Sequence, residues 1–261
     1  MIGSFLNVVV YRISVAENLL GRSYCPHCRT QVAWYDNIPL LSIILLRFKC
    51  RKCQKKISWQ YPLVELGTGI MFLWVGLKFF NPGDAYSLVP TAYYMIMVSF
   101  LAVIFVYDVL YMEIPSIVLW PAVGLAVGYN LLVDWIHLGG EGVLGGGGLL
   151  GNSTYSGTLA AFLAFLFFFL LVSLSKEKWM GMGDALLVIL LGLLLGWPQI
   201  LLALFLAFAI GAVYGIILIA SRIKSIKSQV PFAPFLIIGT VISLFFYGPI
   251  TEWYFRLFWF F

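Results

Sequence analysis

The stretch PTAYYMIMVSFLAVIFVYDVLYMEIP, residues 90–115, decides the fold class of this chain. From Pro90 to Tyr107 it holds no charged residue, and Asp108 then ends the apolar run. An α-helix rises about 1.5 Å per residue, so an apolar run of about 20 residues crosses a hydrocarbon core of about 30 Å. We therefore expect a membrane helix that ends at an acidic residue.

The rest of the chain repeats this pattern of apolar runs and short polar breaks. Of its 261 residues, 62% are hydrophobic and 10% are charged, which is too little polar surface to coat a soluble globule. The sequence predicts an all-α polytopic membrane protein with about eight transmembrane helices. The expected spans are 1–14, which is short for a membrane helix, 62–80, 90–107, 114–135, 157–175, 184–197, 198–221 and 231–247.

Positive charge is concentrated near the N-terminus. Nine of the 16 Lys and Arg residues lie between Arg12 and Lys56, and such an excess marks a cytoplasmic loop. Residues 15–60 are therefore expected to be cytoplasmic. No pattern of interleaved aromatic and basic residues accompanies the charge, so no nucleic-acid partner is expected. No basic region precedes the first apolar run, so no cleavable signal peptide is expected either.

The domain organisation follows from this loop. A short first helix at 1–14 and a membrane catalytic domain of about seven helices at 61–261 are expected on either side of it. The Gly-rich segment 137–156 holds no Lys or Arg and is expected to be an extracytoplasmic linker. Alternating spans from the loop put Asp108 and Asp184 at the same, cytoplasmic membrane face.

Four cysteines, the whole complement of the chain, form two CxxC pairs, Cys25 with Cys28 and Cys50 with Cys53. Two such turns can present four thiolates to one tetrahedral Zn²⁺ ion. Since no position is left for water, we expect a structural zinc in a zinc-ribbon-like loop. A pair of disulfides is the main alternative and fits poorly with a reducing cytoplasm. His27, between two ligands, is expected to be a bystander.

Asp108 and Asp184 form a second constellation, and Asp184 closes the sequence GMGD with Gly181 and Gly183. A charged residue near the hydrocarbon is costly, although each acid alone has a simpler explanation as a residue that terminates or caps a helix. Capping does not require glycines. We expect them to permit close backbone approach and unusual dihedral angles beside Asp184.

Two adjacent carboxyl groups cannot both ionise easily, so one holds a proton while the other acts as a base on water, as in aspartic proteases. The helix dipole favours an anion at a helix N-terminus and disfavours it at a C-terminus. We therefore hypothesise that Asp184 is the resting base and Asp108 the resting acid, with the roles exchanged during a cycle.

Glu65 is a third polar candidate. It lies just inside the span 62–80, where an unpaired acid is costly. Two interpretations stay open, an ion pair with a basic loop residue or a contact with a positively charged substrate or ligand.

Motifs along nearly the whole chain resemble those of the type IV prepilin peptidases, also called leader peptidase/N-methyltransferases. They are GSFLNVVVYR at 3–12, SYCPHC at 23–28, NIPLLS at 37–42, CRKC at 50–53, YPLVE at 61–65, Asp108 with Ile114 and Pro115, GMGD at 181–184 and PFAP at 231–234. The resemblance implies a membrane aspartyl protease of eight transmembrane helices with Asp108 and Asp184 as its catalytic aspartates.

The same resemblance implies a substrate, a location and a second activity. Family members remove the short basic leader of prepilins and pseudopilins at the cytoplasmic face of the bacterial inner membrane. Many also methylate the new amino terminus with S-adenosylmethionine, and Glu65 and Arg12 are our candidates for the substrate or methyl-donor region. Leu186 and Ala233 depart from the family pattern, which commonly has a lysine and a glycine there.

Three other interpretations remain. A protease of the presenilin and signal-peptide-peptidase type shares a YD and GxGD pair, but it lacks the four-cysteine loop, and no PAL tripeptide follows here. A transporter or channel with a zinc-stapled loop would place its acids in the middle of spans rather than at helix ends. A non-enzymatic assembly protein for pili or secretion would tolerate substitution of both aspartates.

Overall fold

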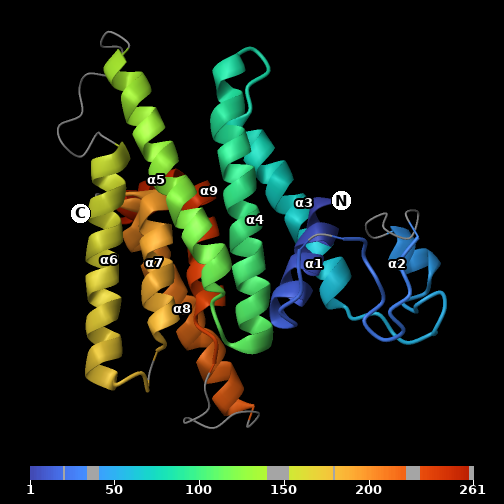
Figure 1. The fold of residues 1–261 in the computed structure, drawn as a ribbon. Helices are drawn as coiled ribbons and strands as arrows, with labels where there is room; N and C mark the ends of the chain where they lie inside the picture. Colours follow the sequence, from blue (N-terminus) through green and yellow to red (C-terminus); the bar gives the residue numbers. More distant parts are fainter. Residues whose placement is uncertain (20, 34–40, 140–152, 179, 222–229, 259–261) are drawn as a thin grey trace. The chain divides into compact units, whose positions relative to one another are not determined.

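The computed structural model describes residues 1–19, 21–33, 41–139, 153–178, 180–221 and 230–258, and its regular structure there is helical apart from isolated β-bridges (Figure 1). The helices are α1 (Ile2–Ser14), α2 (Leu41–Leu45), α3 (Gln60–Phe79), the 3₁₀ turn η2 (Ala85–Ser87), α4 (Leu88–Tyr111), α5 (Ser116–Gly139), α6 (Ser153–Ser175), α7 (Met182–Leu195), α8 (Gln199–Ala220) and α9 (Ala233–Phe258).

Six of these helices are long and apolar enough to cross a membrane, namely α3, α4, α5, α6, α8 and α9. With two shorter apolar helices, α1 and α7, the described residues hold eight apolar helices in all. The prediction of an all-α polytopic membrane protein with about eight membrane helices is confirmed. The Gly-rich linker lies largely outside the described residues, as does the basic segment 222–227.

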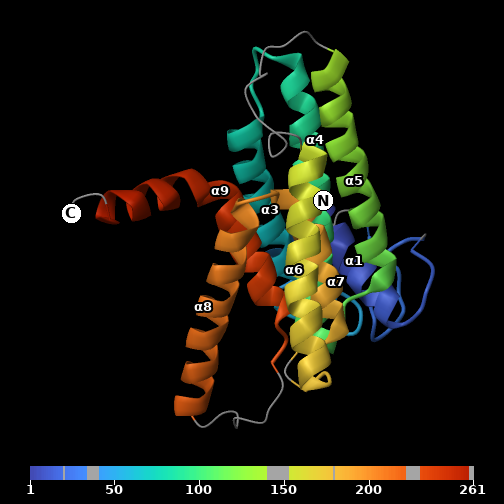
Figure 2. The same ribbon diagram turned by 90° about the vertical axis from the view of Figure 1, so that its left-hand side faces the viewer.

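Two helices run further than the sequence predicts. α4 continues to Tyr111, so Asp108 lies within its last turn rather than behind it. α9 was expected to end near Tyr247, but it continues to Phe258, through Pro249, a residue type that normally breaks or kinks a helix. Figure 2 shows its C-terminal part turned sharply away from α8, as expected of a helix that is kinked at proline.

Contacts divide the chain into two compact units, Met1–Tyr107 and Asp108–Phe261. In the first unit α1 packs on α3, and a Cβ atom at Gly3 would lie 2.8 Å from the Cα atom of Glu65. Asn7, which is 1% exposed, donates to the carbonyl oxygen of Tyr61 at 3.2 Å. These contacts explain the glycine and the asparagine of the motif GSFLNVVVYR. The predicted boundaries at 14/15 and 60/61 stay a prediction.

In the second unit the short helix α7 contacts α5, α6, α8 and α9. Small residues let these helices approach closely, as is common where helices pack in membranes. A Cβ atom at Gly192 of α7 would lie 2.5 Å from backbone atoms of Ala161 in α6. One at Gly239 of α9 would lie 2.3 Å from the carbonyl oxygen of Ala203 in α8. Close packing of α7 fixes where its first turn, with Asp184, lies in this unit.

Two polar side chains of α5 also hold this unit together. Asn130 donates to the carbonyl oxygen of Leu193 in α7 at 3.0 Å. The carboxyl oxygens of Asp134 accept the backbone N–H groups of Ser153 and Thr154, at 2.8 and 2.9 Å. Asp134 therefore caps the N-terminus of α6 from another helix, where the helix has N–H groups without intrahelical partners.

Candidate metal centre and candidate active site

Each CxxC pair lies in a turn that is closed by a β-bridge. The bridge joins Tyr24 with Gln31 around the first pair and Lys49 with Lys56 around the second. Both turns therefore have the same length, with the two cysteines at the same positions after the first bridge residue. We call residues 24–31 the first knuckle and residues 49–56 the second knuckle.

The backbone geometry of the two knuckles also matches. The N–H group of Cys25 donates to the carbonyl oxygen of Thr30, and that of Cys50 donates to the carbonyl oxygen of Lys55, both at 2.9 Å. The residue after the second cysteine is left-handed in each knuckle, with φ of 51° and 57°. Local turns, rather than a hydrophobic core, thus orient the four thiols.

The four cysteines form one cluster, in which the sulfur atoms all lie within 4.8 Å of one another. The Sγ atoms of Cys25 and Cys53 are 3.9 Å apart, close to the value of about 3.8 Å that tetrahedral geometry gives for metal–sulfur bonds of about 2.3 Å. A disulfide would need about 2.05 Å, and all four thiols are free. The cluster can hold a tetrahedral metal ion, and His27 is not part of it.

The thiols of the cluster differ in their pKa values. Hydrogen bonds from the side chain and backbone of Thr30 lower the pKa of Cys28 to about 6. For Cys53, a backbone hydrogen bond from Lys55 is outweighed by partial burial and by the neighbouring thiols, which raise its pKa to about 11. Because metals bind thiolates, the lowered pKa values of Cys28 and Cys50 favour metal binding, whereas metal binding would release a proton from Cys53.

Asp108 lies in the last turn of α4 and is 4% exposed. The backbone N–H group of Ala233, the first residue of α9, donates to its carboxyl group. Its Oδ2 atom is buried and has no hydrogen-bond partner within the described part of the chain. The helix then stops at Met112, which has a left-handed φ of 56°. A buried carboxyl oxygen without a donor is better accommodated when it carries a proton.

Asp184 is the third residue of α7, and Gly181 is the N-cap of that helix. The carboxyl group of Asp184 accepts a hydrogen bond from the backbone N–H group of Gly181. In return, the backbone N–H group of Asp184 donates to the carbonyl oxygen of Gly181 at 3.2 Å. The contact from side chain to N-cap is one half of a capping box, so Asp184 does cap its helix, as the simpler interpretation holds. Capping does not account for the neighbouring carboxyl group of Asp108, which lies close enough to interact with it electrostatically.

The glycines of GMGD do not have the unusual dihedral angles that the sequence analysis expected. Gly181 has φ −80° and ψ 155°, which any residue adopts, and Gly183 is helical. A Cβ atom at Gly183 would lie 3.4 Å from the side chain of Ile114, an ordinary contact. Gly183 therefore faces Ile114, in the segment that follows Asp108. The space at residue 183 would hold a small side chain.

The contact from Ala233 is a feature that sequence reasoning missed. Residue 233 was noted only as a departure from a usual glycine, whereas the structure uses its backbone N–H group, at a helix N-terminus, to contact Asp108. The signal available in the sequence was the proline on each side in PFAP, which favours a helix start.

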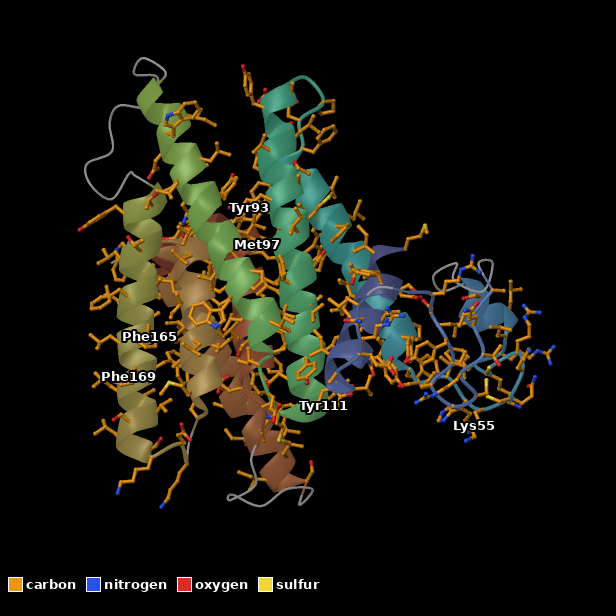
Figure 3. The ribbon with its side chains drawn as sticks, viewed as in Figure 1. Lys55, Tyr93, Met97, Tyr111, Phe165 and Phe169 are labelled. Atoms are coloured by element: carbon orange, nitrogen blue, oxygen red, sulfur yellow. The ribbon has the colours of Figure 1, made fainter. Side chains whose placement is uncertain are left out.

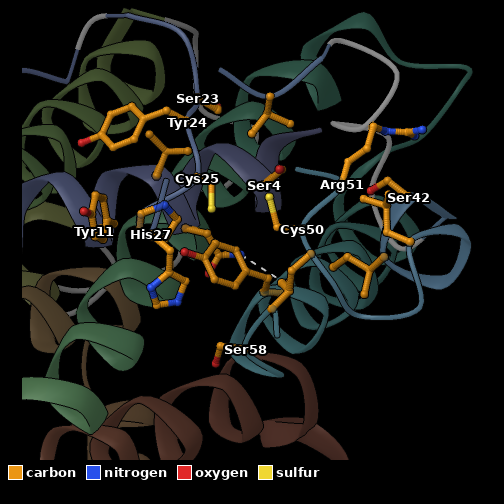
Figure 4. A pocket seen from close by; sticks show the side chains of 18 of the residues that line it. Ser4, Tyr11, Ser23, Tyr24, Cys25, His27, Ser42, Cys50, Arg51 and Ser58 are labelled. Carbon is orange, nitrogen blue, oxygen red and sulfur yellow. Dashed lines mark hydrogen bonds between the residues drawn. The ribbon is translucent and has the colours of Figure 1, made fainter. Parts of the chain in front are cut away.

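Arg12 and Glu65 lie in the first unit. The guanidinium group of Arg12, which is 4% exposed, donates to the carbonyl oxygens of Asn18, Leu19 and Arg22, at 3.1, 2.6 and 3.1 Å. Arg12 thereby holds the chain that leaves α1. Glu65 lines a cavity of about 510 Å³ next to the cysteine cluster, and Figure 4 shows Tyr11, His27, Cys25 and Cys50 around it. A ligand contact of Arg12 or Glu65 stays a prediction.

Comparisons with known proteins identify the family of this chain. Residues 1–79 match the bacterial peptidase A24 N-terminal domain, and residues 95–216 match the type IV leader peptidase family. A prepilin leader peptidase/N-methyltransferase of Aeromonas hydrophila is 32% identical over 97% of this chain and 90% of its own length.

Two further relatives carry the same name. The Myxococcus xanthus (strain DK1622) protein is 34% identical over 84% of this chain and 60% of its own length. The Bacillus subtilis (strain 168) protein is 27% identical over 98% of this chain and 95% of its own length. No solved structure matches the chain. With two family domains that together span most of its length, and a relative of this identity, the chain belongs to the type IV leader peptidase family.

Proposed function

We propose that this protein is an aspartic endopeptidase that removes the short basic leader of type IV prepilins and pseudopilins at the cytoplasmic face of the bacterial inner membrane. The names of its relatives support the substrate class. The observation that carries the mechanism is the pair of interacting carboxyl groups, Asp108 and Asp184, which come from two helix ends in one compact unit.

In the proposed mechanism Asp184 is the resting base. It sits in the first turn of α7 and accepts the N–H group of Gly181, and both features favour its anion. Asp108 is the resting acid: it accepts one backbone N–H group, that of Ala233, but its buried Oδ2 atom lacks a donor among the described residues and it lies at the C-terminal end of α4. Neutron diffraction that places the shared proton on Asp184 in the resting enzyme would contradict this assignment.

The two groups exchange roles during hydrolysis. Asp184 takes a proton from water, the water oxygen attacks the carbonyl carbon at the leader junction, and Asp108 gives its proton to the carbonyl oxygen. When the tetrahedral intermediate collapses, the C–N bond breaks, Asp184 gives its proton to the leaving amine, and Asp108 takes back the proton from the oxygen. Each carboxyl group thus returns to its starting state.

A membrane location would simplify substrate binding. A prepilin that is anchored by its own apolar helix diffuses in two dimensions, and its basic leader on the cytoplasmic side places the junction near the two acids. We propose the same orientation for this chain because its excess of Lys and Arg lies at 12–56.

We further propose that the cysteine cluster binds a structural Zn²⁺ ion. Four thiolates at these separations suit tetrahedral zinc and leave no position for a catalytic water. The relatives' names also support N-methylation of the new amino terminus, with S-adenosylmethionine as the methyl donor. Mass spectrometry of a processed prepilin would test this activity by the added mass of one methyl group.

The test of the peptidase is cleavage of a prepilin by the purified protein in lipid, with Asp108→Asn and Asp184→Asn as variants. Each variant is expected to lose at least about 100-fold in rate, since general acid–base catalysis contributes about 10²–10⁴. Asp134→Asn is the matched control, because it removes a carboxylate outside the candidate active site, and its amide oxygen can still accept one of the N–H groups of Ser153 and Thr154. All three need an unchanged thermal unfolding profile.

The outcomes separate the candidate functions. Loss of cleavage in both active-site variants but not in the control supports the pair of acids. Normal cleavage by either variant would mean that the substituted aspartate only caps or ends its helix. A wild-type protein that does not cleave any prepilin would favour a transporter, a channel or a non-enzymatic assembly protein instead.

A further inference from the structure

The cavity beside the cysteine cluster has a strongly cationic lining. Of the described residues that line it, five are Lys or Arg residues, and Glu65 is the one acid. Four of the cations belong to the second knuckle, and all four of these side chains are exposed: Arg51, Lys52, Lys55 and Lys56. The fifth is Arg12, which already donates to three carbonyl oxygens.

The positive charge of the cavity lining favours an anionic ligand. An anion gains from several cations at once, whereas a sulfonium compound such as S-adenosylmethionine would be repelled. Lysine and arginine are also the side chains that bind phosphate groups. The cavity therefore fits an anionic phosphate group better than a methyl donor, even though Glu65 lies in its wall.

The surroundings of the cavity add an apolar part to this site. Trp59 follows the second knuckle and immediately precedes α3, a candidate membrane span, and it is 66% exposed. Its ring lies 4.4 Å from that of Phe48, measured between centroids. Tryptophan is enriched at the boundary between membrane and water. Further along α3, Leu63 and Leu73 are 62% and 61% exposed and offer surface for an acyl chain.

We propose that the second knuckle and the start of α3 form a binding site for an anionic phospholipid. The phosphate group lies among Arg51, Lys52, Lys55 and Lys56 at the cavity, Trp59 lies at the level of the head groups, and the acyl chains follow the exposed leucines of α3. Figure 3 shows Lys55 among the side chains that extend from this part of the chain. Because only residues 57–59 join the second knuckle to α3, the site faces a lipid surface wherever α3 enters the membrane.

Native mass spectrometry of the full chain in neutral detergent tests the proposal, with phosphatidylglycerol and phosphatidylcholine as probes. Each basic residue near an anionic lipid surface contributes about 1 kcal/mol, which is about fivefold in affinity. Combined Lys52→Gln, Lys55→Gln and Lys56→Gln substitutions should therefore weaken phosphatidylglycerol binding by about 100-fold and leave phosphatidylcholine binding unchanged.

A second set of variants separates this site from general charge and from misfolding. Lys176→Gln, Lys178→Gln and Arg256→Gln together remove the same charge from exposed positions of the other unit and should retain the lipid. Replacing the three knuckle lysines by arginine should also retain it. Equal loss in the two glutamine variants, or equal binding of the two lipids by the wild type, would overturn the proposal.

Inorganic phosphate distinguishes a lipid site from a site for a free anion. If the lipid is the ligand, millimolar phosphate should leave phosphatidylglycerol bound, because phosphate cannot replace the contacts of the acyl chains. Complete displacement at that concentration would show that the cavity recognises a free anion, and the phospholipid would then be the wrong ligand.

Discussion

The cysteine cluster and the aspartate pair bring reactive groups together in different ways. The cysteines all lie between residues 25 and 53, and two matching turns orient them through their own backbone hydrogen bonds. Asp108 and Asp184 are 76 residues apart and come from the ends of α4 and α7. The cluster therefore depends on local turns, whereas the aspartate pair depends on how distant helices pack.

The largest difference between the two sites is expected when one thiol of the cysteine cluster is removed. Structural zinc contributes about 10–16 kcal/mol to small zinc domains, so Cys25→Ser should weaken metal binding by about 1,000-fold or more. Elemental analysis of the purified protein measures the metal per chain. Asp108→Asn should keep its full metal content, because the two sites lie in separate compact units.

His27→Ala is the control for the cysteine variant. His27 lies between two ligands in sequence but is not part of the cluster, so its removal should leave the metal bound. Metal loss in His27→Ala, or full metal content in Cys25→Ser, would mean that the four-thiol site is wrongly assigned.

A larger side chain in α7 should displace Asp184 from Asp108 and leave the cysteine cluster unchanged. In Gly192→Ala the new Cβ atom would meet the backbone of α6 at 2.5 Å, so α7 must shift. Overpacking of this kind costs about 1–3 kcal/mol. The expected result is a lower thermal unfolding temperature and slower cleavage, with unchanged metal content.

Gly124→Ala is matched to that variant, since nothing lies within 4 Å of a Cβ atom there. Alanine favours a helix by about 1 kcal/mol over glycine, so this change should be neutral or slightly stabilising. If the two alanine variants lose cleavage equally, close approach of α6 and α7 does not position Asp184.

The smallest expected effect concerns the turn after Asp108. Met112 has a left-handed φ of 56°, a conformation that glycine adopts without steric cost. Met112→Gly should change the free energy of unfolding by less than about 1 kcal/mol, in the stabilising direction, because relief of strain offsets the greater freedom of the unfolded chain. Thermal unfolding measures it.

Val109→Gly, one turn earlier in α4, is expected to change the free energy of unfolding in the opposite direction. Val109 is helical and 49% exposed, so glycine there should destabilise α4 by roughly 0.5 kcal/mol. Equal destabilisation by the two glycine variants would indicate that the left-handed turn does not limit the end of α4.

Much of the fold was predictable because apolar runs and polar breaks depend on composition over long windows. The ends of α4 and α9 were not, since α4 continues past Asp108 and α9 continues past Tyr247 and through Pro249. The four-cysteine cluster was predictable from spacing, because its geometry is local.

The aspartate site was predictable in its residues but not in its contacts. The sequence indicated Asp108 and Asp184, yet the N–H group of Ala233 that contacts Asp108 comes from α9, far along the chain. Likewise, in the second unit close backbone packing requires glycine at Gly192 and Gly239 rather than beside Asp184. Such contacts depend on tertiary packing, which spacing alone does not encode.

The cap that Asp134 provides for α6 has a consequence for protein engineering. This side chain joins α5 to the start of α6 directly, so it helps to fix where α6 begins relative to α5. Lengthening an existing connection costs little entropy. A reporter tag or an affinity sequence inserted between the two helices should therefore leave both in register, provided that Asp134, Ser153 and Thr154 are kept.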